Sequence, residues 1–221
     1  MLRLYHLPLC PFSRKIRLAL AEKGLAFEPV EVEPWRAGEA FYDLNPAGEV
    51  PVLLDGELVL CDSNAIAEYL EEAYPEPSLY GTQLAQRAET RRLVFWFDVK
   101  FRQEVTDPLF GEKLLKRLKR AGTPDSERLR RGAANLHHHL RYIGALYEVR
   151  RWLAGDELSM ADLAAAAHLS VLDYLGAVPW EAHEAARDWY ARVKSRPSFR
   201  PLLTDRVVGI RPPPHYEDLD F

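Results

Sequence analysis

The apolar residues in the first 75 positions change their spacing along the chain, and each spacing predicts a different element. Alternating apolar residues at positions 2–7 predict a short strand, and the helical spacing in RKIRLALAEKG predicts a helix that stops at Gly24. Residues 27–32 alternate weakly and predict a second strand, and residues 39–44 predict a short helix. Together with the hairpin and helix that follow, this order predicts an α/β unit with a mixed sheet.

A β-hairpin is predicted where two apolar runs, residues 50–54 and 58–61, flank Asp55-Gly56. Pro51 cannot donate a ladder hydrogen bond, so it belongs at the start of a strand or in a bent, even cis, peptide. A bend at this point leaves the backbone amide and carbonyl of Val50 free for a ligand.

The helix after the hairpin opens at Asp62-Ser63, where capping side chains precede the apolar spacing of AIAEYLEEAY. A free amide edge beside a helix start can hold a small carboxylate ligand. The Pro and Ser residues after Tyr74 then end regular structure. The predicted organisation is a first domain at residues 1–75, a linker at 76–86, a second domain at 87–205 and a tail at 206–221.

Five further segments have helical spacing and are separated by Gly, Pro or capping residues, which predicts an all-α second domain. They are residues 86–101, 107–120, 125–151, 161–175 and 184–195. Ser159 and Asp162 have the spacing of a capping box at the start of the fourth segment. The residues that follow are small and apolar on nearly every face, which is typical of a helix at the centre of a bundle.

Composition excludes several classes of function. Of the 221 residues 48% are hydrophobic, enough for a full core, and the formal net charge of -4 argues against general nucleic-acid binding. Cys10 and Cys61 form neither a disulfide framework nor a Cys/His metal motif, and a bond between them requires Cα atoms within about 7 Å. Without a signal sequence or an apolar run of about 18 residues, we expect a soluble protein of the reducing cytoplasm.

Cys10 is the candidate for nucleophilic chemistry. It follows the first strand, and Pro11 suits the first turn of the next helix, so the thiol lies at a helix N-terminus with Arg14 and Lys15 nearby. Free amides and positive charges lower a thiol pKa. Because Ser13 stands where a C-x-x-C motif has its second cysteine, redox chemistry here requires an external thiol. The alternative is a fold that is retained without activity.

Three other features predict either binding surfaces or ordinary solvent exposure. Residues 137–139 are histidines, but consecutive helical residues diverge by about 100°, which favours a solvated face over a metal site. Five cations within residues 113–120 predict a basic amphipathic helix for an acidic partner or a membrane surface, with a solvated face as the alternative. Trp35 lies in the polar EPWRAGE loop, which predicts an exposed interface anchor.

The chain resembles the glutathione S-transferase superfamily through CPFS, NPAGEVPVL, the Asp-Gly turn and the acidic residue with Ser at the next helix start. In the second half, GDELSMADLAAAAHLSVLDYLG resembles the capped central helix of the same family. The resemblance implies a thioredoxin-like N-terminal domain, an all-α C-terminal domain, and glutathione as ligand or co-substrate. It also implies that Val50 and Pro51 bind the cysteinyl backbone of glutathione, while Asp62 and Ser63 bind its γ-glutamyl end. Asp62 is one methylene shorter than the usual Glu.

The ending RPPPHYEDLDF combines a stiff polyproline segment with acids interleaved among aromatic and aliphatic residues. The acidic-aromatic part predicts partner binding, whereas a tail that packs along its own domain is the alternative for the prolines. The residues predicted to contact a partner are Tyr216, Asp218, Leu219, Asp220 and Phe221.

Over its whole length, and mainly through this tail, the chain is similar to a bacterial cell-division protein of the transferase fold. The resemblance implies a noncatalytic homodimer that binds the tubulin-like polymer FtsZ in the cytoplasm, at the division site. Two alternatives stay open: an active glutathione-dependent transferase or thiol reductase that uses Cys10, and an RNA-polymerase-associated or other protein-binding member of the fold. None of them implies a nucleic-acid partner, a metal or a membrane span.

Overall fold

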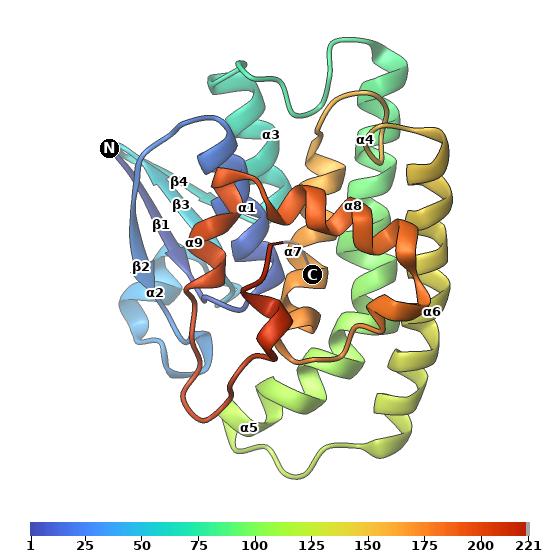
Figure 1. Ribbon diagram of the computed structural model, residues 1–221. Helices are drawn as coiled ribbons and strands as arrows, with labels where there is room; N and C mark the ends of the chain where they lie inside the picture. The colour runs from blue at the N-terminus through green and yellow to red at the C-terminus, as the bar shows by residue number, and fades with distance from the viewer. Residues whose placement is uncertain (220–221) are drawn as a thin grey trace. The chain divides into compact units, whose positions relative to one another are not determined.

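The computed structural model describes residues 1–219 and divides into two compact units, of which the first is Met1–Leu79 and the second begins at Tyr80 (Figure 1). The first unit is α/β and the second is helical, so the predicted fold class is confirmed. Within the described residues, no helix is both long enough and apolar enough to cross a membrane.

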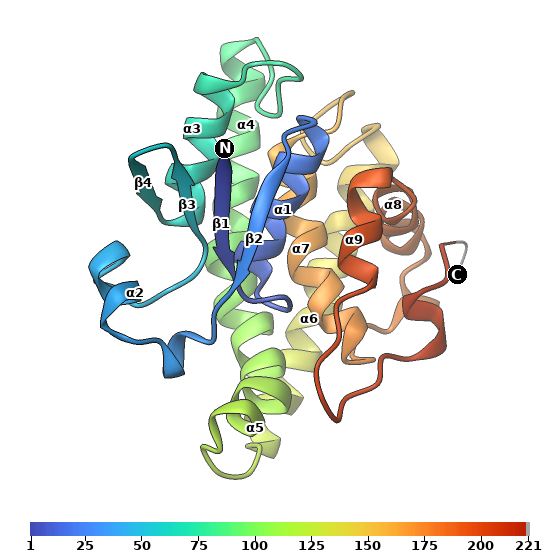
Figure 2. The same cartoon turned by 90° about the vertical axis from the view of Figure 1, so that its left-hand side faces the viewer.

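The first unit contains a four-stranded mixed sheet (Figure 2). Its strands are β1 (Leu2–His6), β2 (Phe27–Glu31), β3 (Val52–Asp55) and β4 (Leu58–Cys61), in the order β2-β1-β3-β4. β1 pairs parallel with β2 and antiparallel with β3, and β3 pairs antiparallel with β4. Pro29 is tolerated in β2 because β2 is an edge strand, where a missing amide interrupts no second ladder.

Helices α1 (Pro11–Glu22) and α3 (Ser63–Ala73) pack against each other, while η1 (Pro34–Arg36, a 3₁₀-helix) and α2 (Glu39–Leu44) connect β2 to β3. The apolar positions predicted from the spacing form the core of this unit. Leu4, Leu53, Ile66 and Leu70 are all fully buried. Burial of these side chains stabilises the unit by about 1.5–3 kcal/mol for each one.

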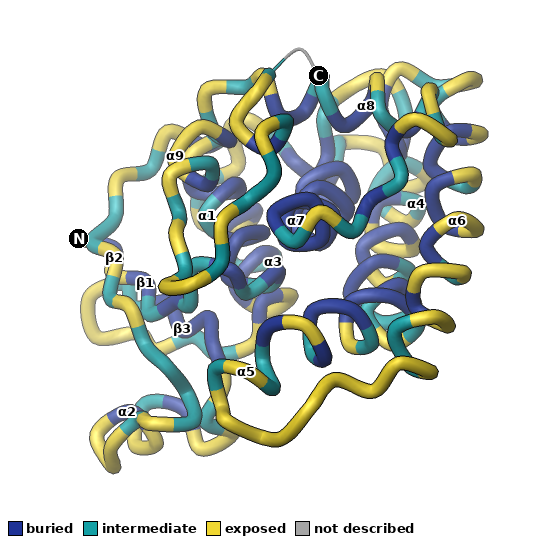
Figure 3. The backbone as a smooth tube through the Cα atoms, turned by 60° about the horizontal axis from the view of Figure 1, so that its bottom comes forward, coloured by how far each residue is buried: buried dark blue, intermediate teal, exposed yellow. Residues whose placement is uncertain are grey.

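The second unit is built from helices of very different length. They are α4 (Leu84–Phe95), η2 (Trp96–Leu115), α5 (Lys116–Lys119), α6 (Ser126–Val149), α7 (Met160–Tyr174), η3 (Trp180–Ala182), α8 (Glu184–Lys194), η4 (Pro197–Phe199), α9 (Arg200–Leu203) and η5 (Pro214–Tyr216). Every residue of α7 is buried, as Figure 3 shows by its uniform dark blue. The apolar sequence of α7 therefore predicted its central place.

The capping box of α7 is present as predicted, with Asp162 accepting from the backbone and side chain of Ser159. The same carboxylate also accepts from the Leu153 amide and from the indole of Trp189, each at 2.9 Å. Asp162 therefore joins the start of α7 to the preceding loop and to α8.

The predicted break between residues 101 and 107 is wrong. Helix runs without interruption from α4 through η2 to α5, and η2 has the wider π-type backbone pairing with Pro108 inside it. The buried side chains of Phe97, Phe101, Val105 and Leu109 continue at a spacing of four across the expected gap. Proline removes one helical hydrogen bond and crowds the preceding turn, and π-type turns are a known way for a helix to absorb such a defect.

Candidate functional site

Cys10 caps the N-terminus of α1, directly after the loop that leaves β1. Its Sγ lies 3.8 Å from the carbonyl oxygen of Val50, and the side chain is partly buried. Pro11 occupies the first turn of α1, as the sequence predicts. The thiol therefore lies where the strand, the helix start and the bend before β3 meet.

Burial raises the pKa of the Cys10 thiol above its ordinary value, although hydrogen bonds from Ser13 and from the Phe12 amide act in the opposite direction. The expected cationic neighbours bind elsewhere. The guanidinium of Arg14 donates to the carbonyl of Pro8 at 2.8 Å, and the ammonium of Lys15 donates to Asn64 at 2.9 Å. The pKa of the thiol therefore lies above its ordinary value, opposite in direction to the low-pKa thiol that the sequence predicted, because burial outweighs the helix start.

The Val50-Pro51 peptide is cis, which agrees with the bent peptide predicted before the hairpin. Among the described residues, the Val50 amide donates to no protein acceptor, since the β1–β3 ladder begins only at Val52. Val50 also packs with Phe41 and Val52 in a small cluster against which Cys10 rests. An unpaired amide beside the thiol is a suitable site for the backbone of a small peptide ligand.

Asp62 is the N-cap of α3, and its Oδ1 accepts from the amides of Asn64 and Ala65 at 2.6 and 3.2 Å. Its backbone has φ 70° and ψ 127°, a conformation that residues with a side chain rarely adopt. Asp62 is exposed and Ser63 is buried. The cap thus presents one carboxylate and one hydroxyl close to Cys61, which rests on the same cluster as Cys10.

These residues fit the polar ends of glutathione. The Val50 amide and carbonyl can pair with the backbone of a cysteinyl residue, and the Asp62 carboxylate can accept from an α-amino group. The α3 N-terminus and the Ser63 hydroxyl suit the adjoining carboxylate. Within the described residues, no cluster of three His, Cys, Asp or Glu side chains has the geometry of a metal site.

Trp35 differs from the prediction of an exposed anchor. It lies in η1 and is only partly exposed, and its indole nitrogen is buried. The histidine tract also differs in part. His137 and His138 are exposed as predicted, but His139 is fully buried and bonds to Trp96 and Glu104.

The tail is held against the second unit rather than extended into solvent. Tyr216 is fully buried, its hydroxyl donates to the Leu202 carbonyl at 3.1 Å, and its ring meets Tyr174 edge to face. Direct contact of Tyr216 with a partner is thus a wrong prediction, because this side chain is part of the core. Asp218 is exposed and Leu219 half-buried, and the predicted contacts Asp220 and Phe221 lie outside the described residues.

Sequence reasoning missed the polar group that fixes this tail, which we call the tail clamp: the buried Asp173 and Lys194 and the partly exposed His215. Asp173 accepts from the His215 ring at 3.0 Å and from the Trp180 indole at 2.8 Å, and Lys194 donates to the His215 carbonyl at 2.7 Å. Burial raises the pKa of Asp173 and lowers that of Lys194 to about 8. The available signal was Asp173 near the end of the apolar α7, away from the capping box, since a buried carboxylate requires partners.

The sequence and the structure were compared with those of known proteins. Residues 4–78 match the family model described as glutathione S-transferase, N-terminal domain, and residues 118–197 match its C-terminal domain. The chain is 51% identical over 222 residues to FtsZ-localized protein A of Caulobacter vibrioides, covering 99% of this chain and 97% of that one.

Two solved structures are similar to this chain over essentially their full lengths. A glutathione S-transferase from Rhodospirillum rubrum F11 has 60% identity and a TM-score of 0.98, covering 100% of both chains. FzlA from C. crescentus has 51% identity and a TM-score of 0.97, covering 100% of this chain and 99% of that one. The chain belongs to the glutathione S-transferase family.

Proposed function

We propose that this chain is a noncatalytic regulator of bacterial cell division that binds FtsZ polymer. The observation that carries the proposal is the similarity to FtsZ-localized protein A over almost the whole of both chains. A match confined to the transferase domains would support only the fold, because one fold hosts many functions. The raised pKa of the Cys10 thiol also supports a noncatalytic role, since the thiolate is the reactive form.

The tail is the proposed contact with FtsZ, and the clamp gives it a fixed base. Lys194 and Asp173 hold His215, and the buried Tyr216 anchors the next position. The proposed contacts therefore narrow to Asp218, Leu219, Asp220 and Phe221, which follow the anchor. A tail with an ordered base loses less conformational entropy on binding than a free one.

Deletion of residues 219–221 tests this contact, because it leaves the clamp and the buried Tyr216 in place. We expect the truncated protein to keep its melting temperature and to lose co-sedimentation with FtsZ polymer. Asp218→Asn should weaken co-sedimentation, whereas Asp156→Asn makes the same charge change in an exposed loop and should not. Undiminished pelleting of the truncated protein would exclude the tail as the contact.

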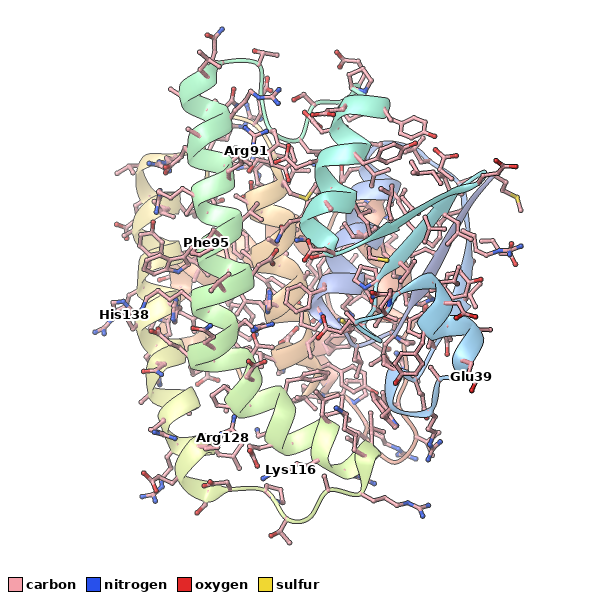
Figure 4. All side chains as sticks on the ribbon, turned by 180° about the vertical axis from the view of Figure 1, so that it is seen from behind. Glu39, Arg91, Phe95, Lys116, Arg128 and His138 are labelled. Atoms are coloured by element: carbon pink, nitrogen blue, oxygen red, sulfur yellow. The ribbon has the colours of Figure 1, made fainter. Side chains whose placement is uncertain are left out.

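We also propose a homodimer, in which two tails bridge or curve filaments through avidity. Support comes from the outer face of α4, where the Phe95 side chain is 66% exposed and Arg91 lies on the same helix (Figure 4). Next to Phe95, the rings of Trp96 and Tyr142 lie 4.6 Å apart. Aromatic side chains of this kind are enriched at protein interfaces.

Trp35 remains a second candidate for contact with a partner. The proposed location of the protein is the cytoplasm, at the division site.

A second candidate is an active glutathione-dependent transferase or thiol reductase. It is favoured by the unpaired Val50 amide beside the Cys10 thiol and by the Asp62-Ser63 cap. In this role Val50, Pro51, Asp62 and Ser63 hold glutathione, and Cys10 forms the mixed disulfide. Titration with millimolar glutathione and turnover of Cys10→Ser separate the two candidates: glutathione-dependent turnover that disappears in Cys10→Ser would establish the enzyme.

A further inference from the structure

The charge of the second unit is very uneven. Residues 113–131 contain eight cations and two acids, a local net charge of +6, whereas the whole chain carries -4 and the remainder therefore -10. The cations are Lys113, Lys116, Arg117, Lys119, Arg120, Arg128, Arg130 and Arg131, and the acids are Asp125 and Glu127. We call residues 113–131 the basic segment; it includes the end of η2, all of α5 and the start of α6.

Two of these cations pair with one buried acid. The buried carboxylate of Glu112 pairs with Lys116 and Arg128, and it also accepts from the Asp125 amide at 2.8 Å. Figure 4 shows Lys116 and Arg128 at one end of the unit, far from Arg91. The other six cations on either side of the turn are exposed: Lys113, Arg117, Lys119, Arg120, Arg130 and Arg131.

An apolar loop tip lies beside these cations. The loop at residues 206–211 meets α5, since the Arg117 guanidinium lies 2.5 Å from where a side chain on Gly209 would begin. Figures 1 and 2 both show this loop and α5 at the same end of the unit. At the tip, Val208 is 96% exposed.

The loop tip is held in shape from behind. The Tyr174 hydroxyl accepts from the Val207 amide at 3.0 Å and donates to the Ile210 carbonyl at 2.9 Å. Val207 and Ile210 also form a two-residue bridge around the tip. An aliphatic side chain that is exposed on an ordered turn does not stabilise the fold, because it buries no apolar surface there. A contact with another molecule would bury this surface.

We propose that the basic segment and the Val208 tip form a peripheral binding surface for an anionic lipid bilayer. Exposed Lys and Arg residues near a negatively charged membrane each contribute about 1 kcal/mol, which corresponds to about fivefold in affinity. An aliphatic tip adds apolar insertion at the headgroup level, which an acidic protein segment would not require. The combination therefore favours a membrane over an acidic polypeptide. This proposal does not rest on the proposed FtsZ contact, which uses the tail beyond Tyr216.

Vesicle co-sedimentation tests the surface with the full-length chain. We expect pelleting with phosphatidylcholine vesicles that contain phosphatidylglycerol and none with phosphatidylcholine alone. Binding should weaken steeply when salt rises from about 0.05 to about 0.5 M, because the Debye length falls several-fold over this range. Absence of binding to the anionic vesicles at the lower salt concentration would overturn the proposal.

Matched variants locate the surface. Arg117→Gln with Lys119→Gln should weaken vesicle affinity about 25-fold, at fivefold for each charge. The control pair Arg141→Gln with Arg151→Gln removes the same charge at exposed positions on α6 and in the loop that follows it, outside the basic segment, and should change affinity less than about twofold. Equal losses in both pairs would mean that net charge, rather than this surface, governs binding.

Val208→Ser separates a membrane from an acidic protein partner. On a bilayer we expect about tenfold weaker binding with an unchanged salt dependence, because only the apolar contribution is lost. If polyglutamate binds the protein as tightly as the vesicles do and Val208→Ser has no effect on vesicle binding, the surface recognises acidic polypeptides and the lipid proposal fails.

Discussion

The thiol of Cys10 is subject to two opposing influences on its ionisation. The start of α1 supplies amide donors that favour the thiolate, whereas burial favours the neutral thiol and prevails. Sequence spacing places the cysteine at the helix start but does not report how much of the chain covers it.

A pH titration of Cys10 reactivity checks this balance. In a Cys61→Ala background only Cys10 can react, and its alkylation rate should have a midpoint above about 8.5, the ordinary thiol value. Alkylation is followed by mass spectrometry from neutral to alkaline pH. A midpoint below that value would contradict the buried thiol and favour the enzyme candidate.

Glu71 is a second residue whose ionisation depends on burial. Burial opposes its charge, but the Leu79 amide, the Ser78 hydroxyl and the Lys23 ammonium outweigh it and lower the pKa of the carboxyl. The Lys23 and Glu71 side chains are almost fully buried and lie 2.9 Å apart. The pair joins the end of α1 to α3.

Glu71→Gln should lower the free energy of unfolding by about 3 kcal/mol at neutral pH, since it leaves the buried Lys23 charge with the carbonyls of Tyr74 and Pro77 but without an anionic partner. A carboxyl with a lowered folded pKa stabilises the fold above its unfolded pKa and loses this contribution as pH falls. The difference between wild type and variant should therefore shrink below about pH 4. Urea unfolding at neutral and acid pH measures it, and a pH-independent difference would disagree with an ionised Glu71.

At the scale of helices and strands, the spacing of apolar residues predicted the correct element wherever one spacing continued through the whole segment. The apolar α7, its capping box and the hairpin between β3 and β4 were all predictable, because local preference and burial agree there. The continuous helix through Pro108 was not predictable in this way. The proline predicted a break, whereas the apolar spacing of Phe97, Phe101 and Leu109, which are buried, predicted one helix.

The candidate site was predictable to a similar degree. The bend at Pro51 and the cap at Asp62 follow from the local sequence. The tail clamp does not, because its three members are brought together by packing of α7, α8 and the tail. No local pattern links residues 173, 194 and 215.

Lys194 gives this clamp a pH dependence. Burial lowers its pKa to about 8, against partial opposition from Asp173 and Asp218, whereas an unfolded lysine titrates near 10.4. Between these values the unfolded chain binds more protons than the folded one, so this group makes the protein more stable as pH rises. The gain has an upper limit of about 1.4 kcal/mol per pH unit.

The measurement is the difference in unfolding free energy between wild type and Lys194→Met from pH 8 to pH 10. Both proteins contain the same two cysteines, so the effect of cysteine ionisation on stability is the same in each and drops out of the difference. We expect the unfolding free energy of the wild type to rise relative to that of the variant as pH rises. A difference that stays constant would show that Lys194 has the same pKa in both states.

At the scale of the whole molecule, the proposed dimer makes one firm prediction. Phe95→Asp places a charge on the exposed aromatic face of α4 and should convert the dimer to a monomer, as measured by light scattering after gel filtration. Val208→Asp makes the same kind of change at the loop tip and should leave the dimer intact. A dimeric Phe95→Asp would move the interface away from this face of α4.

The uneven charge of the basic segment also affects how the protein behaves on a chromatography column. A resin interacts with the face that approaches it rather than with the sum of all charges. Although the formal net charge is -4, we expect the protein to be retained at low salt on a cation exchanger as well as on an anion exchanger. Neutralising Arg117 and Lys119 should shorten retention on the cation exchanger while leaving the isoelectric point slightly more acidic.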